Sequence, residues 1–228
     1  MKEKRVGAII VAAGESKRMS GVDKVFAELG GKPLLARVLD AVQECDAVDK
    51  IVVVLGRENL KRGRELIKGR RWAKVVTVCQ GGKRRQDSVK EGLKQLTDCQ
   101  WVVIHDGARP LFSHEMIERG LAEAQETGAA VAAVPVKDTI KIATPDGFVR
   151  DTPQRGTLWA AQTPQVFRFD LISQAHERIT EDVSDDATMI ERLGYKVKIY
   201  MGSYENIKVT TPEDLALAEI ILRRNSKH

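Results

Sequence analysis

The chain has 228 residues, of which 43% are hydrophobic and 30% are charged, and these proportions are ordinary for a globular protein. The formal net charge of +5 favours anionic ligands, but only 5% of the residues are aromatic, so the mixed basic and aromatic pattern of single-strand nucleic-acid binders is missing. The length suits one α/β domain with a full core, and the composition favours phosphorylated small molecules over nucleic acid as partners.

Strands and helices are predicted to alternate along the first 135 residues. Apolar runs rich in β-branched residues predict buried strands at 6–11, 51–55, 75–78, 101–104 and 130–134. Helices are predicted to begin at Pro33, at about Glu58, around Ser88 and at about Ser113. Repeated βα units of this kind favour a three-layer α/β fold with a mostly parallel sheet.

The pattern changes between Pro135 and Pro164. Short runs at 139–142 and 148–150 flank a turn at 144–147, which predicts a β-hairpin that protrudes from the sheet as an arm. Apolar positions on an arm usually pack on something, and a second subunit is a reasonable partner. We therefore expect one domain over residues 1–228, with 136–163 as a β-arm for dimerisation.

The last third of the chain is predicted to return to helices, with a strand at 196–201. A C-terminal helix is expected after Thr211, which is suited to be its N-cap, with Pro212 in the first position and acidic residues in the first turn. Asp185 and Asp186 are interpreted as acids at a helix start rather than as a metal site.

The first strand leads into a loop that is suited to bind a polyphosphate. Its sequence is Ala12-Ala13-Gly14-Glu15-Ser16-Lys17-Arg18-Met19, followed by Lys24. Small residues let backbone N–H groups approach a phosphate, and the three cations supply countercharge. Met19 stands where a Walker A loop needs its second glycine, and Ser16 stands where a dinucleotide fingerprint needs one. An ordinary basic βα turn is the alternative interpretation.

Ligands of open α/β sheets bind beyond the carboxyl ends of the strands, so further segments are expected to join this loop. They are Gly81–Ser88, Asp106–Arg109 and the region of Lys208. Gly81, Gly82 and Ser88 offer backbone groups and a hydroxyl suited to a base or ribose. Asp106 offers the single carboxylate that Mg²⁺ needs beside phosphate oxygens and water. A loop-capping Asp106, or one paired with Arg109, is the alternative, and His105 is interpreted as packed or hydrogen-bonded rather than as a ligand.

Cys45, Cys79 and Cys99 are odd in number and widely spaced, which indicates reduced, mostly buried thiols rather than a zinc site or a disulfide framework. No apolar run approaches the ~18 residues of a membrane span, and the N-terminus lacks the pattern of a signal peptide. We expect a cytoplasmic protein with no membrane partner.

In their order along the chain, the segments at 14–24, 81–89, 105–110, 136–139, 158–165 and 206–210 together resemble the 2-C-methyl-D-erythritol 4-phosphate cytidylyltransferase family. The resemblance covers nearly the whole chain and implies a Rossmann-like nucleotidyltransferase sheet. It implies transfer of a cytidylyl group from CTP to 2-C-methyl-D-erythritol 4-phosphate, giving 4-diphosphocytidyl-2-C-methyl-D-erythritol and pyrophosphate in isoprenoid precursor synthesis. Mg²⁺ or another divalent cation, and a homodimer whose arm completes the neighbour's site, are implied as well.

The resemblance also assigns roles to residues. Arg18 and Lys24 match a pair that stabilises the transition state, and Arg155 and Lys208 match residues that hold the incoming phosphate. Positions that match nucleotide contacts are Ala12, Ala13, Gly14, Lys17, Gly81, Gly82, Arg85, Ser88 and Asp106, the last also near the metal. Positions that match substrate contacts are Arg109, Thr139, Arg155, Thr163, Glu205 and Lys208. Glu205 departs from the family pattern, because aspartate is typical there.

The expected mechanism follows from charge. Both reactants are anions, so catalysis consists of positioning and charge stabilisation, without a nucleophilic side chain or a strong base. Three alternatives remain. A D-ribitol 5-phosphate cytidylyltransferase would perform the same chemistry on a similar acceptor, and a non-catalytic nucleotide-binding protein would bind without turnover. A nucleic-acid-binding module would show a steep salt dependence of affinity.

Overall fold

The computed structural model describes residues 5–14, 23–70 and 72–225. Its main sheet has seven strands in the order β11-β7-β10-β6-β1-β4-β5. Strand β10 runs antiparallel to its neighbours β6 and β7, and the other pairings in this sheet are parallel. The predicted mostly parallel sheet is therefore confirmed. The strands are β1 (Val6–Ala12), β4 (Lys50–Leu55), β5 (Val75–Gln80), β6 (Trp101–Asp106), β7 (Ala129–Pro135), β10 (Trp159–Arg168) and β11 (Lys198–Met201).

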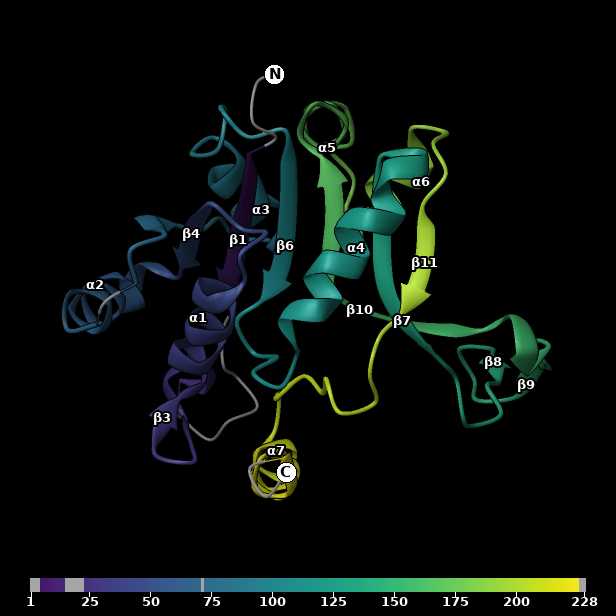
Figure 1. Cartoon of the computed structure of the whole chain (residues 1–228). Coiled ribbons are helices and arrows are strands. Elements are labelled where there is room, and N and C mark those ends of the chain that lie inside the picture. Colours follow the sequence, from purple (N-terminus) through teal and green to yellow (C-terminus); the bar gives the residue numbers. More distant parts are fainter. Residues whose placement is uncertain (1–4, 15–22, 71, 226–228) are drawn as a thin grey trace.

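Helices cover both faces of the sheet, which gives the three layers that were predicted (Figure 1). One buried apolar cluster joins α1 and α4 to one face, and a second joins α3, α5 and α6 to the other. The helices are α1 (Leu34–Glu44), α2 (Leu60–Lys68), α3 (Arg85–Leu93), α4 (His114–Thr127), α5 (Phe169–Arg178), α6 (Asp186–Arg192) and α7 (Pro212–Asn225).

The sequence sets several of these boundaries through local chemistry. All seven residues of β1 are buried, as the apolar run predicted. Helix α4 ends at Gly128, whose φ of 83° is readily available to glycine and whose N–H donates to the carbonyl of Ala124. At the start of α7, Thr211 Oγ1 accepts a hydrogen bond from the Asp214 N–H at 3.3 Å, so its predicted capping role is confirmed.

Strand β10 is the strand of the main sheet that the sequence analysis did not predict. It contains Pro164 and the polar residues Gln162, Thr163 and Gln165, and it lacks the continuous apolar run of the other central strands. Its pairing with β7 shifts register between Ala161 and Gln165. Such a bulge breaks the regular alternation that identifies a strand in a sequence, and it redirects the side chains within it.

The predicted arm is present between β7 and β10. Strands β8 (Ile142–Ala143) and β9 (Val149–Asp151) pair antiparallel in a separate small sheet, which projects beyond β7 and β10 (Figure 1). Strand β8 is shorter than the predicted run at 139–142, whereas β9 has the three residues that were predicted but begins one residue later than expected. The first residues of β10, Trp159 to Ala161, pair with β7 and form the stem of the arm.

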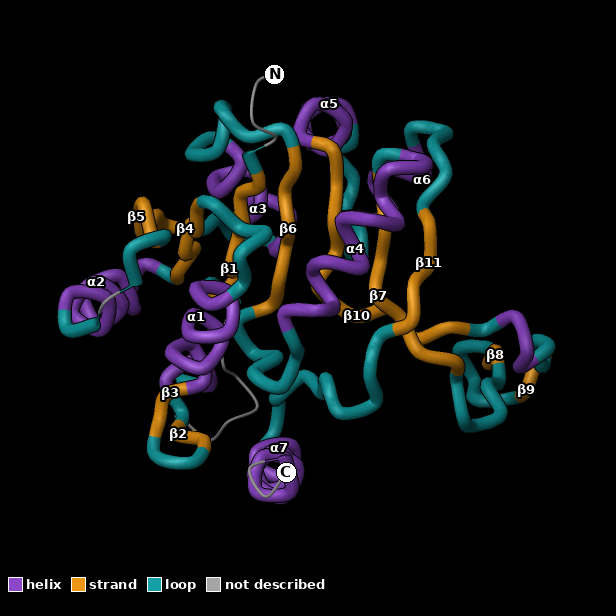
Figure 2. Tube along the Cα trace, in the orientation of Figure 1, coloured by secondary structure: helices purple, strands orange, loops and turns teal. Residues whose placement is uncertain are grey.

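Another small hairpin, β2 (Glu28–Leu29) with β3 (Lys32–Pro33), lies near α7 at the end of the molecule where the parallel strands finish (Figure 2). Leu29 and Leu34 pack there with Val209 and Ala218 in a small third core. In the described part of the chain, no helix is long and apolar enough to cross a membrane. Cys45 and Cys99 are buried free thiols, as predicted, while Cys79 is half-buried.

Candidate active site

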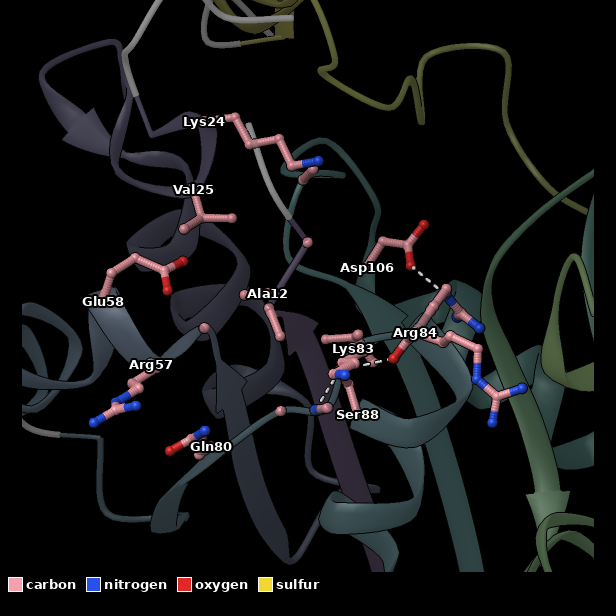
Figure 3. Close-up of a pocket in the computed structure, with 18 of the residues that line it drawn as sticks. Ala12, Lys24, Val25, Arg57, Glu58, Gln80, Lys83, Arg84, Ser88 and Asp106 are labelled. Atoms are coloured by element: carbon pink, nitrogen blue, oxygen red, sulfur yellow. Dashed lines mark hydrogen bonds and ion pairs between the residues drawn. The ribbon is translucent and has the colours of Figure 1, made fainter. Parts of the chain in front are cut away.

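A cavity of about 500 Å³ opens at the carboxyl ends of β1, β5 and β6 (Figure 3). The segments that line it come from all four regions predicted to meet there. From the predicted set, its lining includes Ala12, Ala13, Gly14, Lys24, Gly81, Gly82, Arg85, Ser88, Asp106 and Lys208. Lys17 and Arg18 belong to the first loop but lie outside the described residues. The parallel strands thus bring together groups from positions far apart in the sequence.

The turn after β5 is built so that the backbone can pack closely. A Cβ added at Gly81 would lie 2.4 Å from Cβ of Ala13 and 2.6 Å from Oγ of Ser88. Ser88 is buried, and its Oγ accepts from the Gly82 N–H and donates to the carbonyl of Arg84, both at 3.2 Å (Figure 3). The Ser88 hydroxyl therefore organises the turn, while the backbone of Gly81 and Gly82 lines the cavity.

Lys24 begins a short 3₁₀ helix (Lys24–Phe26), which follows Asp23 as its N-cap. Val25 and Phe26 anchor this helix in the core, while the Lys24 side chain extends over the cavity (Figure 3). Its amine would lie 3.7 Å from a Cβ at Gly14. The Lys24 amine therefore lies close to Gly14, at the carboxyl end of β1.

Asp106, the last residue of β6, is surrounded by three cationic side chains. Its carboxylate lies 2.7 Å from Nζ of Lys208 and 3.2 Å from Nε of Arg85, and Nε of Arg109 is 3.7 Å away. Burial alone would raise the pKa of the Asp106 carboxyl, but Arg85, Lys208 and Arg109 outweigh this effect and hold the pKa well below its ordinary range. Asp106 is therefore ionised at neutral pH, and the surrounding positive charge exceeds its own.

Arg85 is held from its other side by Asp186, the first residue of α6. The two side chains are 2.5 Å apart, and Asp186 also lies 3.2 Å from Nε2 of the buried His176. Burial alone would lower the pKa of Arg85, but Asp186 and Asp106 raise it, so the guanidinium is firmly charged. Asp185 is the N-cap of α6, with Oδ1 3.0 Å from the Thr188 N–H. The interpretation of these acids as helix-start residues is confirmed.

Asn206 brings the Lys208 segment to the sheet. It is fully buried, and its Nδ2 donates to the carbonyl of Thr163 at 2.8 Å and to Oε1 of Gln162 at 3.2 Å. The backbone carbonyl of Asn206 accepts a hydrogen bond from Nη1 of Arg109 at 2.7 Å. Asn206 is the first residue of the segment 206–210 that carries the family resemblance, but no role was predicted for its side chain. A polar residue in a loop gives no sign in the sequence that it will be buried.

His105 is fully buried beside Asp106 and is hydrogen-bonded, as predicted. Its Nε2 lies 3.0 Å from the carbonyl of Arg109, and its Nδ1 lies 3.0 Å from Oγ1 of Thr163. Burial lowers the pKa of His105 to about 4, so the ring is neutral near pH 7. The ring also packs against Phe112, with centroids 4.0 Å apart.

A shallower hollow of about 210 Å³ adjoins the main cavity. It shares Arg85, Asp106 and Lys208 with that cavity and adds Arg109 and Thr163 to its walls. Two residues predicted to contact the acceptor therefore lie next to the predicted nucleotide site. A second ligand bound there would lie beside the same three charged side chains.

Three other predicted substrate residues lie elsewhere in this chain. Thr139 and Arg155 are exposed on the arm, where Arg155 donates to the carbonyl of Lys137 at 3.1 Å. The Glu205 carboxylate faces α7, where Arg224 contacts one oxygen and Asn225 donates to the other at 2.9 Å. None of the three is among the residues that line the two cavities.

The described residues contain no group of three or more His, Cys, Asp or Glu side chains arranged to hold a metal ion. Among the described residues, Asp106 is the one carboxylate that lines both cavities. Such a donor suits a hard divalent cation that takes its remaining ligands from water and phosphate oxygens, as Mg²⁺ does. It does not suit a zinc site, which needs three or four protein ligands.

Comparisons with known proteins agree along the whole chain. A family model for 2-C-methyl-D-erythritol 4-phosphate cytidylyltransferase (IspD) matches residues 6–224. A protein of that name from Dehalococcoides mccartyi is 51% identical over 220 residues, which cover 96% of this chain and 97% of the relative. One from Clostridium perfringens is 44% identical over 219 residues, covering 94% and 97% respectively. The crystal structure of 4-diphosphocytidyl-2C-methyl-D-erythritol synthase from Anaerococcus prevotii has a TM-score of 0.86 at 33% identity, covering 96% of both chains.

Proposed function

The chain belongs to the 2-C-methyl-D-erythritol 4-phosphate cytidylyltransferase family, and on that premise we propose how its cavity acts as the enzyme's active site. The protein is a nucleotidyltransferase that transfers a cytidylyl group from CTP to 2-C-methyl-D-erythritol 4-phosphate. The products are 4-diphosphocytidyl-2-C-methyl-D-erythritol, an isoprenoid precursor of the non-mevalonate pathway, and pyrophosphate. The observation that supports this cavity as the site is the convergence of Lys24, Asp106 and Lys208 from three separate segments.

The reaction joins two anions, so the residues must first reduce their mutual repulsion. An oxygen of the acceptor phosphate attacks the α-phosphorus of CTP in line, and pyrophosphate leaves from the opposite side. The acceptor phosphate is already ionised at neutral pH and needs no base. In this proposal Lys24, with Arg18 of the same loop, stabilises the charge that develops on the α-phosphate and on the leaving group.

The two hollows divide the reactants between them. Gly81, Gly82 and the backbone around Ala13 and Gly14 receive the nucleotide, because their lack of side-chain bulk lets a ligand approach the main chain. Arg109 and Lys208 face the smaller hollow, where the acceptor phosphate would bind. Arg85 and Asp106 lie in the shared wall. This division keeps the attacking oxygen next to the nucleotide phosphates.

Asp106 is the residue that would hold Mg²⁺ or a similar cation. When bound, such an ion neutralises phosphate charge and polarises the phosphoryl oxygens. Lys208 and Arg85 keep the carboxylate ionised and fixed at the end of β6.

The arm of residues 136–163 is proposed to form a homodimer. Its apolar side chains support this, because Phe148 is 72% exposed and Val149 is 61% exposed in the single chain. Thr139 and Arg155 lie on the same arm, so a second subunit would receive them at its own site. Sedimentation velocity at micromolar concentration would measure the dimer, and an Ile140→Asp, Phe148→Asp variant is expected to sediment as a monomer.

A cytoplasmic location of the protein remains a prediction.

The activity is tested by incubating the purified chain with CTP, Mg²⁺ and 2-C-methyl-D-erythritol 4-phosphate. Mass spectrometry should detect the diphosphocytidyl product, and pyrophosphate should form in equal amount. A parallel reaction with D-ribitol 5-phosphate measures the preference between acceptors. Higher kcat/KM with ribitol phosphate would reassign the substrate, and CTP binding without turnover on either acceptor would indicate a nucleotide-binding protein.

A further inference from the structure

The Asp106 backbone, Thr163, His105 and the Arg109 backbone form one buried chain of hydrogen bonds. The Asp106 N–H donates to Oγ1 of Thr163 at 3.0 Å, and Nδ1 of His105 lies 3.0 Å from the same oxygen. Nε2 of His105 then reaches the carbonyl of Arg109, also at 3.0 Å. His105 is 0% exposed and Thr163 is 4% exposed, so solvent has little access to these bonds.

The partners of the imidazole determine where its hydrogen lies. A backbone carbonyl can only accept, so Nε2 must carry the hydrogen. The Thr163 oxygen already accepts from the Asp106 N–H, which leaves its own hydrogen to be donated to Nδ1. A neutral ring with Nε2–H satisfies every one of these groups, whereas a charged ring would be buried without a counterion in direct contact.

This chain of hydrogen bonds joins three parts of the proposed active site. It links the carboxyl end of β6, the bulge of β10 and the turn that carries Arg109. We propose that His105 is a positioning residue for cytidylyl transfer: as the Nε2–H tautomer it fixes the Thr163 hydroxyl and the Arg109 carbonyl, and thereby the placement of Asp106 and Arg109. The inference rests on the proposed function only for its catalytic consequence, because the hydrogen-bond chain exists without any substrate.

The proposal changes the expected role of Thr163. Its hydroxyl hydrogen and one lone pair are already used within the protein, so the side chain acts as a strut behind Asp106 rather than as a primary contact to the acceptor. Phe112 supports the arrangement from the other side by packing on the imidazole. Because Asp106 and Lys208 form an ion pair, displacement of the Asp106 backbone would move the charged wall shared by both hollows.

The first test uses nuclear magnetic resonance of the full chain with ¹⁵N-labelled histidine and no ligand. Long-range ¹H–¹⁵N spectra at pH 7 should show His105 with a protonated Nε2 and an unprotonated Nδ1 that accepts a hydrogen bond. The signal is assigned by its loss in His105→Gln. In Thr163→Val the tautomer should persist while the Nδ1 shift moves to the value of a nitrogen without a hydrogen-bond donor. A ring protonated at Nδ1 would overturn the inference, whatever the enzyme's substrate.

The second test compares Thr163→Val with Thr163→Ser, which keeps the hydroxyl. Thr163→Val leaves the buried Asp106 N–H without its acceptor, so we expect kcat to fall at least about tenfold with the acceptor KM changed less than about twofold. Thr163→Ser should stay within about threefold of the parent in kcat. A raised acceptor KM with unchanged kcat in Thr163→Val would show direct substrate binding and overturn the strut role.

Two controls separate these outcomes from other causes. His114→Gln alters an exposed histidine at the start of α4 and should change neither the His105 signal nor kcat. Thermal denaturation of each variant shows whether the protein remains folded, and Thr163→Ser serves as the second variant if Thr163→Val unfolds. Absence of turnover in the parent would refute the proposed function, while the His105 spectrum would still test the hydrogen-bond chain.

Discussion

The Nζ atom of Lys208 lies 2.7 Å from Oδ2 of Asp106, which connects the loop after β11 to the carboxyl end of β6. The Asp106 side chain is 9% exposed and the Lys208 side chain is 39% exposed, so the lysine amine remains accessible from both hollows. Asp106 thus holds a cation where an incoming phosphate would arrive. This contact underlies the first prediction.

Lys208→Ala should lower kcat/KM for the acceptor by about a hundredfold or more, because a fixed cation facing a phosphate typically stabilises the transition state by ~3 kcal/mol. Lys208→Arg should recover part of this loss, since it keeps the charge but changes the donor geometry. Steady-state pyrophosphate release measures both. Lys94→Ala, which removes an exposed lysine of a surface pair with Glu91, is the matched control and should match the parent.

Lys24→Ala and Arg18→Ala should each reduce kcat by about a hundredfold with the fold intact. Lys24 extends over the cavity, and its backbone is anchored by Val25 and Phe26, so loss of its amine leaves the core unchanged. Single-turnover experiments at saturating CTP isolate the chemical step, and circular dichroism checks the fold. Near-parental turnover of either variant would remove that residue from the catalytic set.

Gly81→Ala should weaken CTP binding by about tenfold or more, because the added carbon would lie 2.4 Å from Ala13 and 2.6 Å from Ser88. Calorimetric titration with CTP and Mg²⁺ measures the change. In Gly69→Ala the added carbon would meet its nearest atoms at 3.6 and 3.8 Å, which are ordinary contacts, so affinity should be unchanged. Equal affinities for both variants would place the nucleotide away from the Gly81 turn.

Asp186→Asn should destabilise the protein by roughly 3–5 kcal/mol at pH 7, because it leaves the buried Arg85 charge with one partner fewer. Burial alone would raise the pKa of Asp186, but Arg85 and His176 lower it below its ordinary value. The stabilisation is therefore present above the ordinary carboxyl pKa and is lost as the pH falls through the lowered value.

Urea denaturation at pH 7, 5, 4 and 3 tests this sign. The difference in unfolding free energy between parent and Asp186→Asn should be nearly constant from pH 7 to 5 and should shrink below about pH 4, where the carboxyl of the unfolded chain takes up its proton. Asp182→Asn changes a neighbouring exposed carboxylate and should show a much smaller difference at every pH. A difference that grows on acidification would contradict the lowered pKa.

Mixing Lys24→Ala with Arg155→Ala should restore activity if the arm serves the neighbour's site. Random exchange gives mixed dimers in which one site has both residues intact, so about a quarter of the parental activity is expected. Each variant alone should be nearly inactive. Activity that stays at the level of the separate variants would show that Arg155 does not act across the dimer.

Much of the fold could be predicted from the sequence, because buried parallel strands are nearly pure apolar runs. Strands β1, β4 and β6 were recognisable for this reason, and the residues just after β1, β5 and β6 were identified as site candidates from strand topology. Strand β10 was missed because its bulge and Pro164 interrupt the pattern. Its place in the centre of the sheet depends on pairing with β6 and β7, which no local window encodes.

The sequence by itself determined the βα order, the small-residue turns, the cationic loop and the family to which these motifs belong, since each depends on neighbouring residues. Only the tertiary structure decided which charges meet. It joined Arg85 to both Asp186 and Asp106, turned Glu205 toward Arg224, and set His105 against Thr163. The physical reason is that burial and hydrogen-bond partners are properties of packed elements, which come together from distant parts of the chain.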